Sequence, residues 1–232
     1  MSSSKPGLMT LVAMAVAVAA APCMAAEPES RSDTSRASII SPGEKAQTSL
    51  FGIQAEGTKF VYVLDHSGSM GGDSGGKALE AAKAELLASL QRLDTVHQFQ
   101  IIVYNHRPRV FNPTGQPGRL AFGTEQNKAE VRRFLGTVQA DGGTDHEEAV
   151  MMALRMHPDV IFLLTDADDP KLSPRQLARI ERFGAGITIH TVEFGTGPQH
   201  EADNFLVKIA RQSGGEHAYV DVMKLPEAKP EK

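Results

Sequence analysis

Short apolar runs separated by polar, glycine-rich segments dominate the pattern of this chain between residues 60 and 220. Apolar runs fall at residues 60–64, 99–104 and 160–164, and residues 187–194 predict another strand. Their length, and the turn residues that bound them, are typical of strands buried on both faces of a sheet. Weaker strand patterns occupy residues 109–111 and 216–220, and residues 50–53 indicate a short edge strand.

Segments with helical periodicity alternate with these runs. Apolar residues recur at helical spacing in residues 77–90 and 127–138, and further helices are expected after Asp145, after Ser173 and over residues 201–212. Ser173, followed by Pro174 and Gln176, is a strong helix start with a capping box. The alternation predicts one doubly wound α/β domain with a mostly parallel sheet and helices on both faces. The short link through Pro108 predicts one antiparallel edge strand.

The first 25 residues form a segment of their own. Lys5 precedes an apolar run over residues 8–21, and small residues surround Cys23, which is the pattern of a secretory signal peptide. The run is short for a membrane span. We therefore expect an exported protein, periplasmic, secreted or attached to the cell surface, with no stable membrane insertion after cleavage. A lipoprotein cleaved at Cys23, which Pro22 disfavours, and an uncleaved anchor are the alternatives.

Composition sets the remaining boundaries. Residues 26–49 are rich in polar side chains and predict a flexible tether, residues 50–225 the folded domain, and residues 226–232 a charged tail. Cleavage removes the one cysteine, so disulfides are not expected. It also removes Lys5, which leaves 23 basic and 28 acidic residues, a net charge of −5. That balance argues against a nucleic-acid partner.

Three predicted loops carry oxygen-bearing side chains. Asp65, Ser67 and Ser69 follow the first buried run, Thr144 precedes a helix, and Asp166 follows a second buried run. In a doubly wound sheet such loops gather at the topological switch point. Two carboxylates and three hydroxyls form a hard, all-oxygen set that selects Mg²⁺, Mn²⁺ or Ca²⁺ over zinc or copper. Neutral hydroxyls leave much of the cation's charge unneutralised, so an open position would attract an outside carboxylate.

These segments resemble the metal-ion-dependent adhesion site (MIDAS) of a von Willebrand factor type A (VWA) domain. The likeness rests on Asp65-His66-Ser67-Gly68-Ser69, Gly142-Gly143-Thr144 and Thr165-Asp166, and it extends over residues 59–222. It implies a Rossmann-like VWA fold, with Asp65, Ser67, Ser69, Thr144 and Asp166 as the metal site. In that family the hydroxyls bind the metal directly, and an aspartate often acts through water. His66, Asp145 and Ala167 depart mildly from the family pattern.

Each segment also allows a plainer interpretation. Asp65 can simply end a strand, Thr144 and Glu147 can form a capping box, and Asp166 can be a solvated loop acid. His66, His146 and His190 are expected to be packed or surface histidines rather than ligands.

Two enzyme patterns are nearly matched in the same region. Residues 71–78 lack the Ser or Thr of a phosphate-binding loop after Lys77, because Ala78 stands there. Residues 67–71 nearly spell the nucleophile elbow of a serine hydrolase, with Ser69 as nucleophile and Asp166 and His190 completing a triad, but Ser67 replaces the first glycine.

The sequence therefore predicts an exported, non-enzymatic binding module, monomeric as a domain. Its divalent cation, Mg²⁺ in the first place, coordinates an Asp or Glu of a protein partner. The alternatives are a hydrolase that uses the same loops and a module whose metal only fastens the loops together. An open coordination position facing solvent distinguishes the first interpretation from the last.

Overall fold

The computed structural model describes residues 43–72, 75–113, 115–116, 118–199 and 201–225. Its strands are β1 (Ala46–Leu50), β2 (Ile53–Gly57), β3 (Lys59–Asp65), β4 (Gln98–Tyr104), β5 (Pro108–Val110), β6 (Ala121–Phe122), β7 (Val160–Thr165), β8 (Thr188–Gly195) and β9 (His217–Asp221). Its helices are α1 (Gly68–Gly71), α2 (Lys77–Gln91), α3 (Glu125–Gly136), α4 (His146–Leu154), α5 (Pro174–Phe183), α6 (Phe205–Ser213) and the 3₁₀ turn η1 (Val222–Lys224). The signal peptide, most of the tether and the tail after residue 225 lie outside the described residues.

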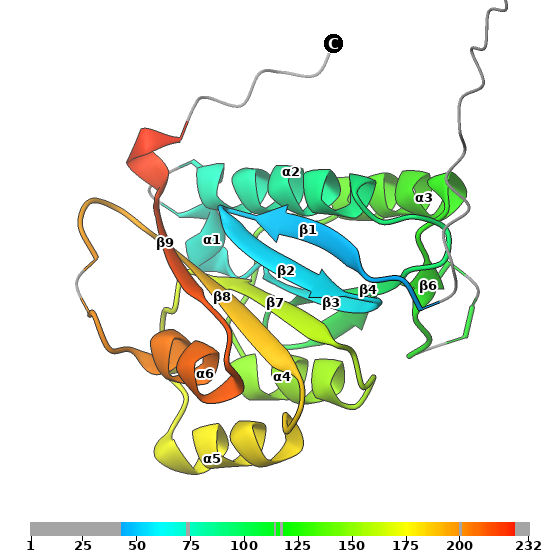
Figure 1. Ribbon diagram of the computed structural model, residues 1–232. Helices are drawn as coiled ribbons and strands as arrows, with labels where there is room; N and C mark the ends of the chain where they lie inside the picture. Colours follow the sequence, from blue (N-terminus) through cyan, green and yellow to red (C-terminus); the bar gives the residue numbers. More distant parts are fainter. Residues whose placement is uncertain (1–42, 73–74, 114, 117, 200, 226–232) are drawn as a thin grey trace, which may run out of the picture. The chain divides into compact units, whose positions relative to one another are not determined.

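A mostly parallel sheet forms the centre of the domain (Figure 1). Its order is β5-β4-β3-β7-β8-β9, with β6 beside β4. The pairs of β3 with β4 and β7, of β7 with β8, and of β8 with β9 are parallel, and β5 and β6 run antiparallel to β4. The predicted doubly wound fold with an antiparallel edge is therefore confirmed. The chain reverses its direction of winding between β3 and β7, which is the switch point where ligands bind in such sheets.

Two apolar layers bury the two faces of the sheet. Alternate side chains of β3 point to opposite faces, because successive residues of a strand do so. Phe60, Tyr62 and Leu64 join α2 and α3 in one core, whereas Val61 and Val63 join α4, α5 and α6 in the other. Figure 1 shows α2 and α3 on one side of the sheet and α4, α5 and α6 on the other. Because β3 is buried on both faces, the loop that follows it is held firmly.

A β-hairpin corrects the predicted tether boundary. β1 begins at Ala46, inside the span of residues 26–49 assigned to the tether, and it pairs antiparallel with β2. Phe51 and Gly52, placed in a short edge strand by the pattern, form the turn with φ values of 48° and 84°. The strand was hidden because its inward position Thr48 is polar. The Thr48 hydroxyl is buried and lies 2.7 Å from that of Ser89 on α2.

Three local differences concern short elements. β6 lies between the strand predicted over residues 109–111 and the helix predicted over residues 127–138, where the sequence predicts no strand, and the single turn α1 was not expected. The last helix, predicted from residue 201, begins at Phe205, because Asn204 caps it by accepting from the N–H groups of Leu206 and Val207. The capping box of Ser173 and Gln176 is present as predicted.

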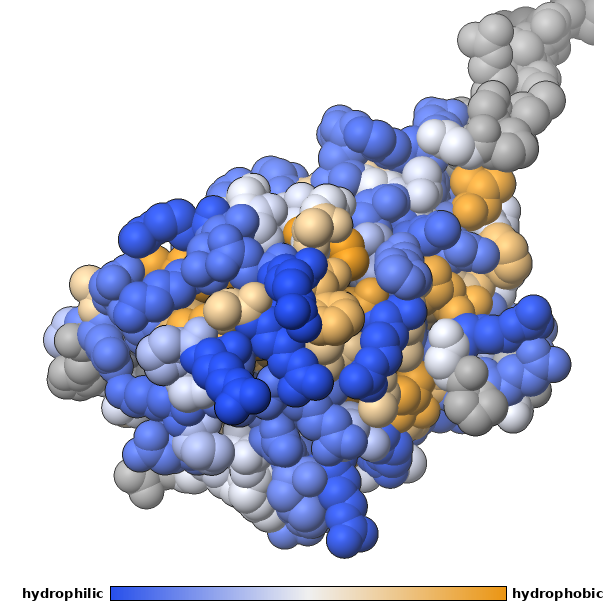
Figure 2. Space-filling view, turned by 90° about the horizontal axis from the view of Figure 1, so that it is seen from below, coloured by the Kyte–Doolittle hydropathy of each residue, from blue (hydrophilic) through white to orange (hydrophobic). Residues whose placement is uncertain are grey.

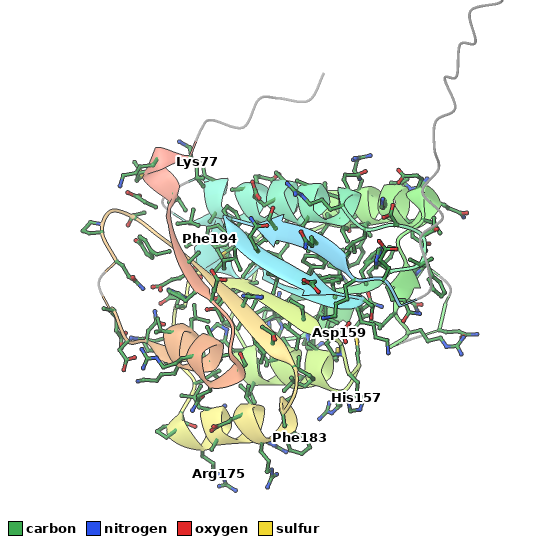
Figure 3. The ribbon with its side chains drawn as sticks, in the orientation of Figure 1. Lys77, His157, Asp159, Arg175, Phe183 and Phe194 are labelled. Carbon is green, nitrogen blue, oxygen red and sulfur yellow. The ribbon has the colours of Figure 1, made fainter. Side chains whose placement is uncertain are left out.

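A separate polar cluster lies at the amino ends of the central strands β3 and β7. Asp159 precedes β7, and Oδ2 of its side chain accepts from the Thr58 N–H, the Thr58 hydroxyl and the Lys59 N–H at 2.6, 2.7 and 3.0 Å. Burial raises the pKa of this carboxyl, but the bonds from Thr58 and Lys59 outweigh burial and hold its pKa below the usual value. Figure 3 places Asp159 far from Phe194, at the other end of the strands. This cluster joins the start of β3 to the start of β7.

The surface is mixed in character. Seen from below in Figure 2, where α5 lies, apolar side chains show in gaps between hydrophilic ones. Large apolar side chains are exposed at Phe122, Phe183 and Met223. Within the described part of the chain, none of the helices has the length and apolar character needed to cross a membrane.

Candidate metal centre

Asp65 ends β3 and is fully buried at the switch point. Its Oδ1 accepts from the Ser67 N–H at 2.8 Å, and its Oδ2 accepts from the Thr165 hydroxyl at 2.6 Å. The bond from Thr165 joins the ends of β3 and β7, which are neighbours in the sheet. A carboxylate that accepts from both sides is fixed in orientation. Asp65 can therefore arrange the loop that carries Ser67 and Ser69.

The two serines face one another at the start of α1. Ser67 precedes this turn and Ser69 lies within it, and their hydroxyl oxygens are 3.1 Å apart. Ser67 is 1 % exposed, whereas Ser69 lies at the surface. The loop therefore presents a pair of hydroxyls that share one side.

The second loop is tied to the first by backbone hydrogen bonds. The Gly68 N–H donates to the Gly142 carbonyl at 2.9 Å, and the Asp141 N–H donates to the His66 carbonyl at 2.8 Å. Half-buried Thr144 follows two residues after Gly142. This pairing brings together loops that are about 75 residues apart in the sequence, as the sequence predicts.

Thr144 does not cap the following helix. Asp145 is the N-cap of α4, and its Oδ1 accepts from the Glu148 N–H at 3.1 Å. The capping interpretation of Thr144 with Glu147 is therefore wrong by one residue. The Thr144 hydroxyl is left out of the helix cap, and Asp145, one of the departures from the family pattern, supplies the cap instead.

Asp166 follows β7 and completes the group. Burial raises the pKa of this carboxyl, the nearby Asp65 charge raises it further, and the Ser69 hydroxyl, which donates to it, lowers it without cancelling the rise. The interaction with Ser69 joins the third loop to the first. Ala167 next to it has φ of 58°, in the left-handed region where glycine has no steric penalty. That conformation is a physical reason why glycine is favoured at this position.

The donor set fits a divalent cation of the hard class. In an octahedral Mg²⁺ shell with bonds of about 2.0–2.1 Å, adjacent ligand oxygens lie about 2.9 Å apart. The two serine oxygens are 3.1 Å apart, close to that spacing. In the described residues no group of three or more His, Cys, Asp or Glu side chains could hold a metal. A site here would therefore depend on hydroxyls as much as on carboxylates.

Two supporting residues escaped the sequence analysis. The Tyr104 hydroxyl lies 2.9 Å from Nδ1 of His146, and burial, followed by the Asp65 charge, raises the pKa of the phenol well above its ordinary value. Asn105 holds the second loop, because its Nδ2 donates to the Asp141 carbonyl and its own carbonyl accepts from the Asp145 N–H. Their position at the carboxyl end of a predicted buried strand was a usable signal.

The arrangement of a serine hydrolase is not formed. His190 lies opposite Phe162 in the register of β7 and β8, three residues before Glu193, which pairs with Thr165. Three residues of strand correspond to about 10 Å. The His190 ring stacks on Phe162, and its Nδ1 accepts from the Glu216 N–H at 3.0 Å. His190 is thus a packed histidine, as the sequence predicts, and Ser69 faces Ser67 and Asp166 instead.

A pocket of about 420 Å³ opens beside these loops. It reaches from Ser69 and Asp166 across the carboxyl ends of β8 and β9. Its other lining residues are Ala78, Ala167, Asp168, Lys171, Glu193, Phe194, Gly195, Thr196, Glu201, Asn204, Tyr219 and Val222.

Replacing Gly142 by alanine is expected to weaken metal binding on the order of tenfold, the scale on which supporting residues act. Gly142 has φ of 75°, and a Cβ there would lie 2.7 Å from Nδ1 of His106 and 3.0 Å from Nδ2 of Asn105. The loop must shift, and Thr144 with it. Calorimetric titration with Mg²⁺ measures the change. Gly136→Ala is the control, because a Cβ at Gly136 meets open space on α3, and an equal loss in both variants would contradict the role of Gly142.

Comparison with known families supports the architecture. Residues 60–168 match the family model described as the von Willebrand factor type A domain. The match begins in β3 and ends just beyond Asp166, so it includes all three loops.

Two relatives match over about two thirds of the chain. An uncharacterized protein of Synechocystis is 26% identical over 168 residues, which are 68% of this chain and 36% of that protein. The human inter-alpha-trypsin inhibitor heavy chain H4 is 26% identical over 172 residues, 67% of this chain and 17% of that protein. The chain thus spans a small part of the length of both relatives.

Solved structures show the same fold. A von Willebrand factor type A protein from Catenulispora acidiphila superposes with a TM-score of 0.61 at 22% identity, over 79% of this chain and 48% of that one. The BatB protein of Bacteroides thetaiotaomicron gives 0.54 at 18% identity, over 71% and 91%. Proximal thread matrix protein 1 of the mussel byssus, whose MIDAS motif holds zinc, gives 0.50 at 19%, over 72% and 42%.

Proposed function

We propose that the three loops of this chain bind a divalent cation that recruits a protein partner, because residues 60–168 match the von Willebrand factor type A family model. The cation, when bound, supplies a positive charge with an open position for an Asp or Glu side chain of the partner. Mg²⁺ is the first choice, with Mn²⁺ and Ca²⁺ as alternatives. No catalysis is part of this function.

Each residue has a distinct part in the proposal. Ser67, Ser69 and Thr144 offer hydroxyl oxygens, which contribute no negative charge. Asp166 contributes a carboxylate at the edge of the site, and Asp65 orients the serine loop from below. Both Asp65 oxygens already accept a hydrogen bond, which supports contact with the metal through water.

One observation carries the proposal, namely that the carboxylates Asp65 and Asp166 lie at neighbouring strand ends beside the paired serine hydroxyls. Burial, followed by the nearby Asp65 charge, raises the pKa of Asp166. Like charges held together are unfavourable without a counter-charge. A divalent cation between the loops would remove this cost. The zinc-occupied motif of the mussel byssus protein gives further support for a cation here.

The proposed setting is outside the cytoplasm. Lys5 and the apolar run over residues 8–21 support export to the periplasm, the medium or the cell surface. In that setting we propose that the domain is monomeric when it binds its partner. The second candidate, a purely structural metal, is favoured by the close ties between the first and second loops.

Retention experiments separate these functions. The chain without residues 1–25, once immobilised, is exposed to proteins from the source cells in Mg²⁺ and in EDTA, beside an Asp65→Asn variant. We expect a protein retained by the unchanged chain in Mg²⁺ alone, whose retention is lost when one of its acidic residues is replaced by Asn or Gln. If retention persists in EDTA and in the variant, the metal does not recruit the partner.

A further inference from the structure

The pocket beside the loops has a buried acid in its wall. Glu193 lies near the end of β8 and is 8 % exposed. Its register partner on β7 is Thr165, so it lies one strand away from the segment that ends at Asp166. Adjacent strands are about 4.8 Å apart. A ligand at the metal would therefore have Glu193 within reach of a neighbouring side chain.

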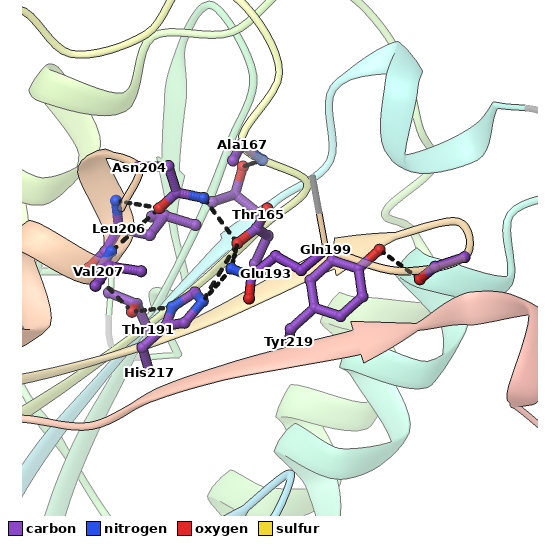
Figure 4. A network of polar contacts seen from close by, with 11 residues as sticks. Thr165, Ala167, Thr191, Glu193, Gln199, Asn204, Leu206, Val207, His217 and Tyr219 are labelled. Carbon is purple, nitrogen blue, oxygen red and sulfur yellow. Dashed lines mark hydrogen bonds and ion pairs between the residues drawn. The ribbon is translucent and has the colours of Figure 1, made fainter. Parts of the chain in front are cut away.

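Neutral donors and one histidine hold this carboxylate in place (Figure 4). Its Oε2 accepts from Nδ2 of Asn204 at 2.7 Å and from Nε2 of Gln199 at 2.9 Å, and Nε2 of His217 lies 3.2 Å away. Asn204 also caps α6, so Glu193 lies at the positive end of that helix. Burial raises the pKa of Glu193, but the bonds from His217, Asn204 and Gln199 outweigh burial and lower it below the ordinary value. The side chain is thus charged at neutral pH.

The charge of Glu193 lacks a permanent cationic partner within the described part of the chain. His217 is the one ion-pair partner found there for it, and it is charged only when protonated. Of the described residues lining the pocket, Lys171 is the one lysine or arginine, and it is paired with Glu201. Asp168 adds a further acid to the wall. The pocket therefore carries excess negative charge even after a cation neutralises Asp166.

The rest of the wall suits the stem of a long side chain. Tyr219 is the register partner of Glu193 on β9 and lines the pocket with partly exposed aromatic surface. The Tyr219 hydroxyl donates to the Gly197 carbonyl at 3.0 Å, and the Gly197 N–H donates to Oδ1 of Asp221 at 3.0 Å. These bonds fasten the loop after β8 to β9, so the wall is preformed. Lysine and arginine combine an apolar stem with a charged head.

We propose that this pocket receives a lysine or arginine side chain of the partner. In the partner's sequence this basic residue lies beside, or within a few positions of, the acidic residue bound at the metal. The recognition of the partner's acidic residue rests on the proposed function. The charged head of this side chain pairs with the Glu193 carboxylate while its apolar stem packs on Tyr219. The domain thus recognises an acidic and a basic side chain together.

Small probes test the pocket without the metal. The amide NMR signals of Phe194, Gly195 and Tyr219 are followed while n-butylguanidinium is added, with n-butylurea as the uncharged probe of the same shape. We expect saturable shifts with the guanidinium probe in Mg²⁺ and in EDTA, and binding roughly tenfold weaker in Glu193→Gln, as the loss of one charged hydrogen bond implies. Glu130→Gln on α3, far from the pocket, makes the same change in charge and should bind as the unchanged chain does.

Equal binding of both probes, or equal binding to the unchanged chain and Glu193→Gln, would overturn the proposal. A pair of short peptides, with arginine or neutral citrulline beside one aspartate, then tests the connection to the metal. We expect the arginine peptide to bind about tenfold more tightly in Mg²⁺, and the difference to vanish in Glu193→Gln. Shifts with guanidinium but no Mg²⁺-dependent peptide binding would count against the proposed function and leave the cation pocket standing.

Discussion

Replacing Asp65 by asparagine is expected to weaken Mg²⁺ binding at least a hundredfold and to leave the fold intact. Asparagine has nearly the same shape and keeps an oxygen that can accept from the Ser67 N–H or the Thr165 hydroxyl. It removes one of the two charges on which the cation depends. Calorimetric titration with Mg²⁺ measures the affinity, and circular dichroism with thermal unfolding checks the fold.

A second substitution separates charge from structure at the same position. Asp65→Ala leaves two buried donors without an acceptor, which costs about 1–3 kcal/mol for each. We therefore expect both variants to lose metal binding, and Asp65→Ala to lose more stability than Asp65→Asn, which leaves one donor without an acceptor instead of two. Mg²⁺ affinity that is unchanged in Asp65→Asn would sink the assignment of the site.

Mg²⁺ is expected to stabilise the unchanged protein by about 2.7 kcal/mol when present at a hundred times its dissociation constant. For a domain of this size, that corresponds to a rise in Tm of about 5–10 °C. The physical reason is that the folded state alone brings Asp65, Asp166 and the hydroxyls together. Differential scanning calorimetry with Mg²⁺ and with EDTA gives the difference.

Asp166 determines how the stability of the metal-free protein changes with pH. In the metal-free protein the folded pKa of Asp166 lies above its unfolded value of 3.8. Its effect on stability is therefore most favourable below pH 3.8 and is lost as the pH rises through the folded pKa. Asp166→Asn should accordingly raise the Tm of the metal-free protein at pH 7 and abolish the gain from Mg²⁺. An Asp166→Asn variant that Mg²⁺ still stabilises fully would contradict the account.

The sequence carried most of the fold and the site because their signals are local. Asp65, Ser67 and Ser69 follow a buried run directly, and parallel strands bring their carboxyl ends to one edge. Thr144 and Asp145 show the limit, since each has a glutamate three residues later and both satisfy the capping pattern. In the structure Asp145 is the residue that caps α4. Its N–H also donates to the backbone carbonyl of Asn105, which directly follows β4.

The features that the sequence pattern did not predict depend on contacts between residues far apart in the chain. Thr48 reads as a polar tether residue until Ser89 of α2 is placed beside it. In the sequence Glu193 is a single acidic residue inside a predicted strand. Its side chain is held by Asn204, Gln199 and His217, which lie in a helix cap, a loop and another strand. No spacing rule joins those positions.

Diffraction at the manganese absorption edge, from crystals grown with Mn²⁺ in place of Mg²⁺, tests the central claim most directly. The account predicts one anomalous peak within about 2.2 Å of the Ser67 and Ser69 hydroxyl oxygens. It also predicts a coordination position that faces solvent and holds water or an outside carboxylate. A peak elsewhere, or a shell filled entirely by oxygens of this chain, would contradict a cation that recruits an acidic partner.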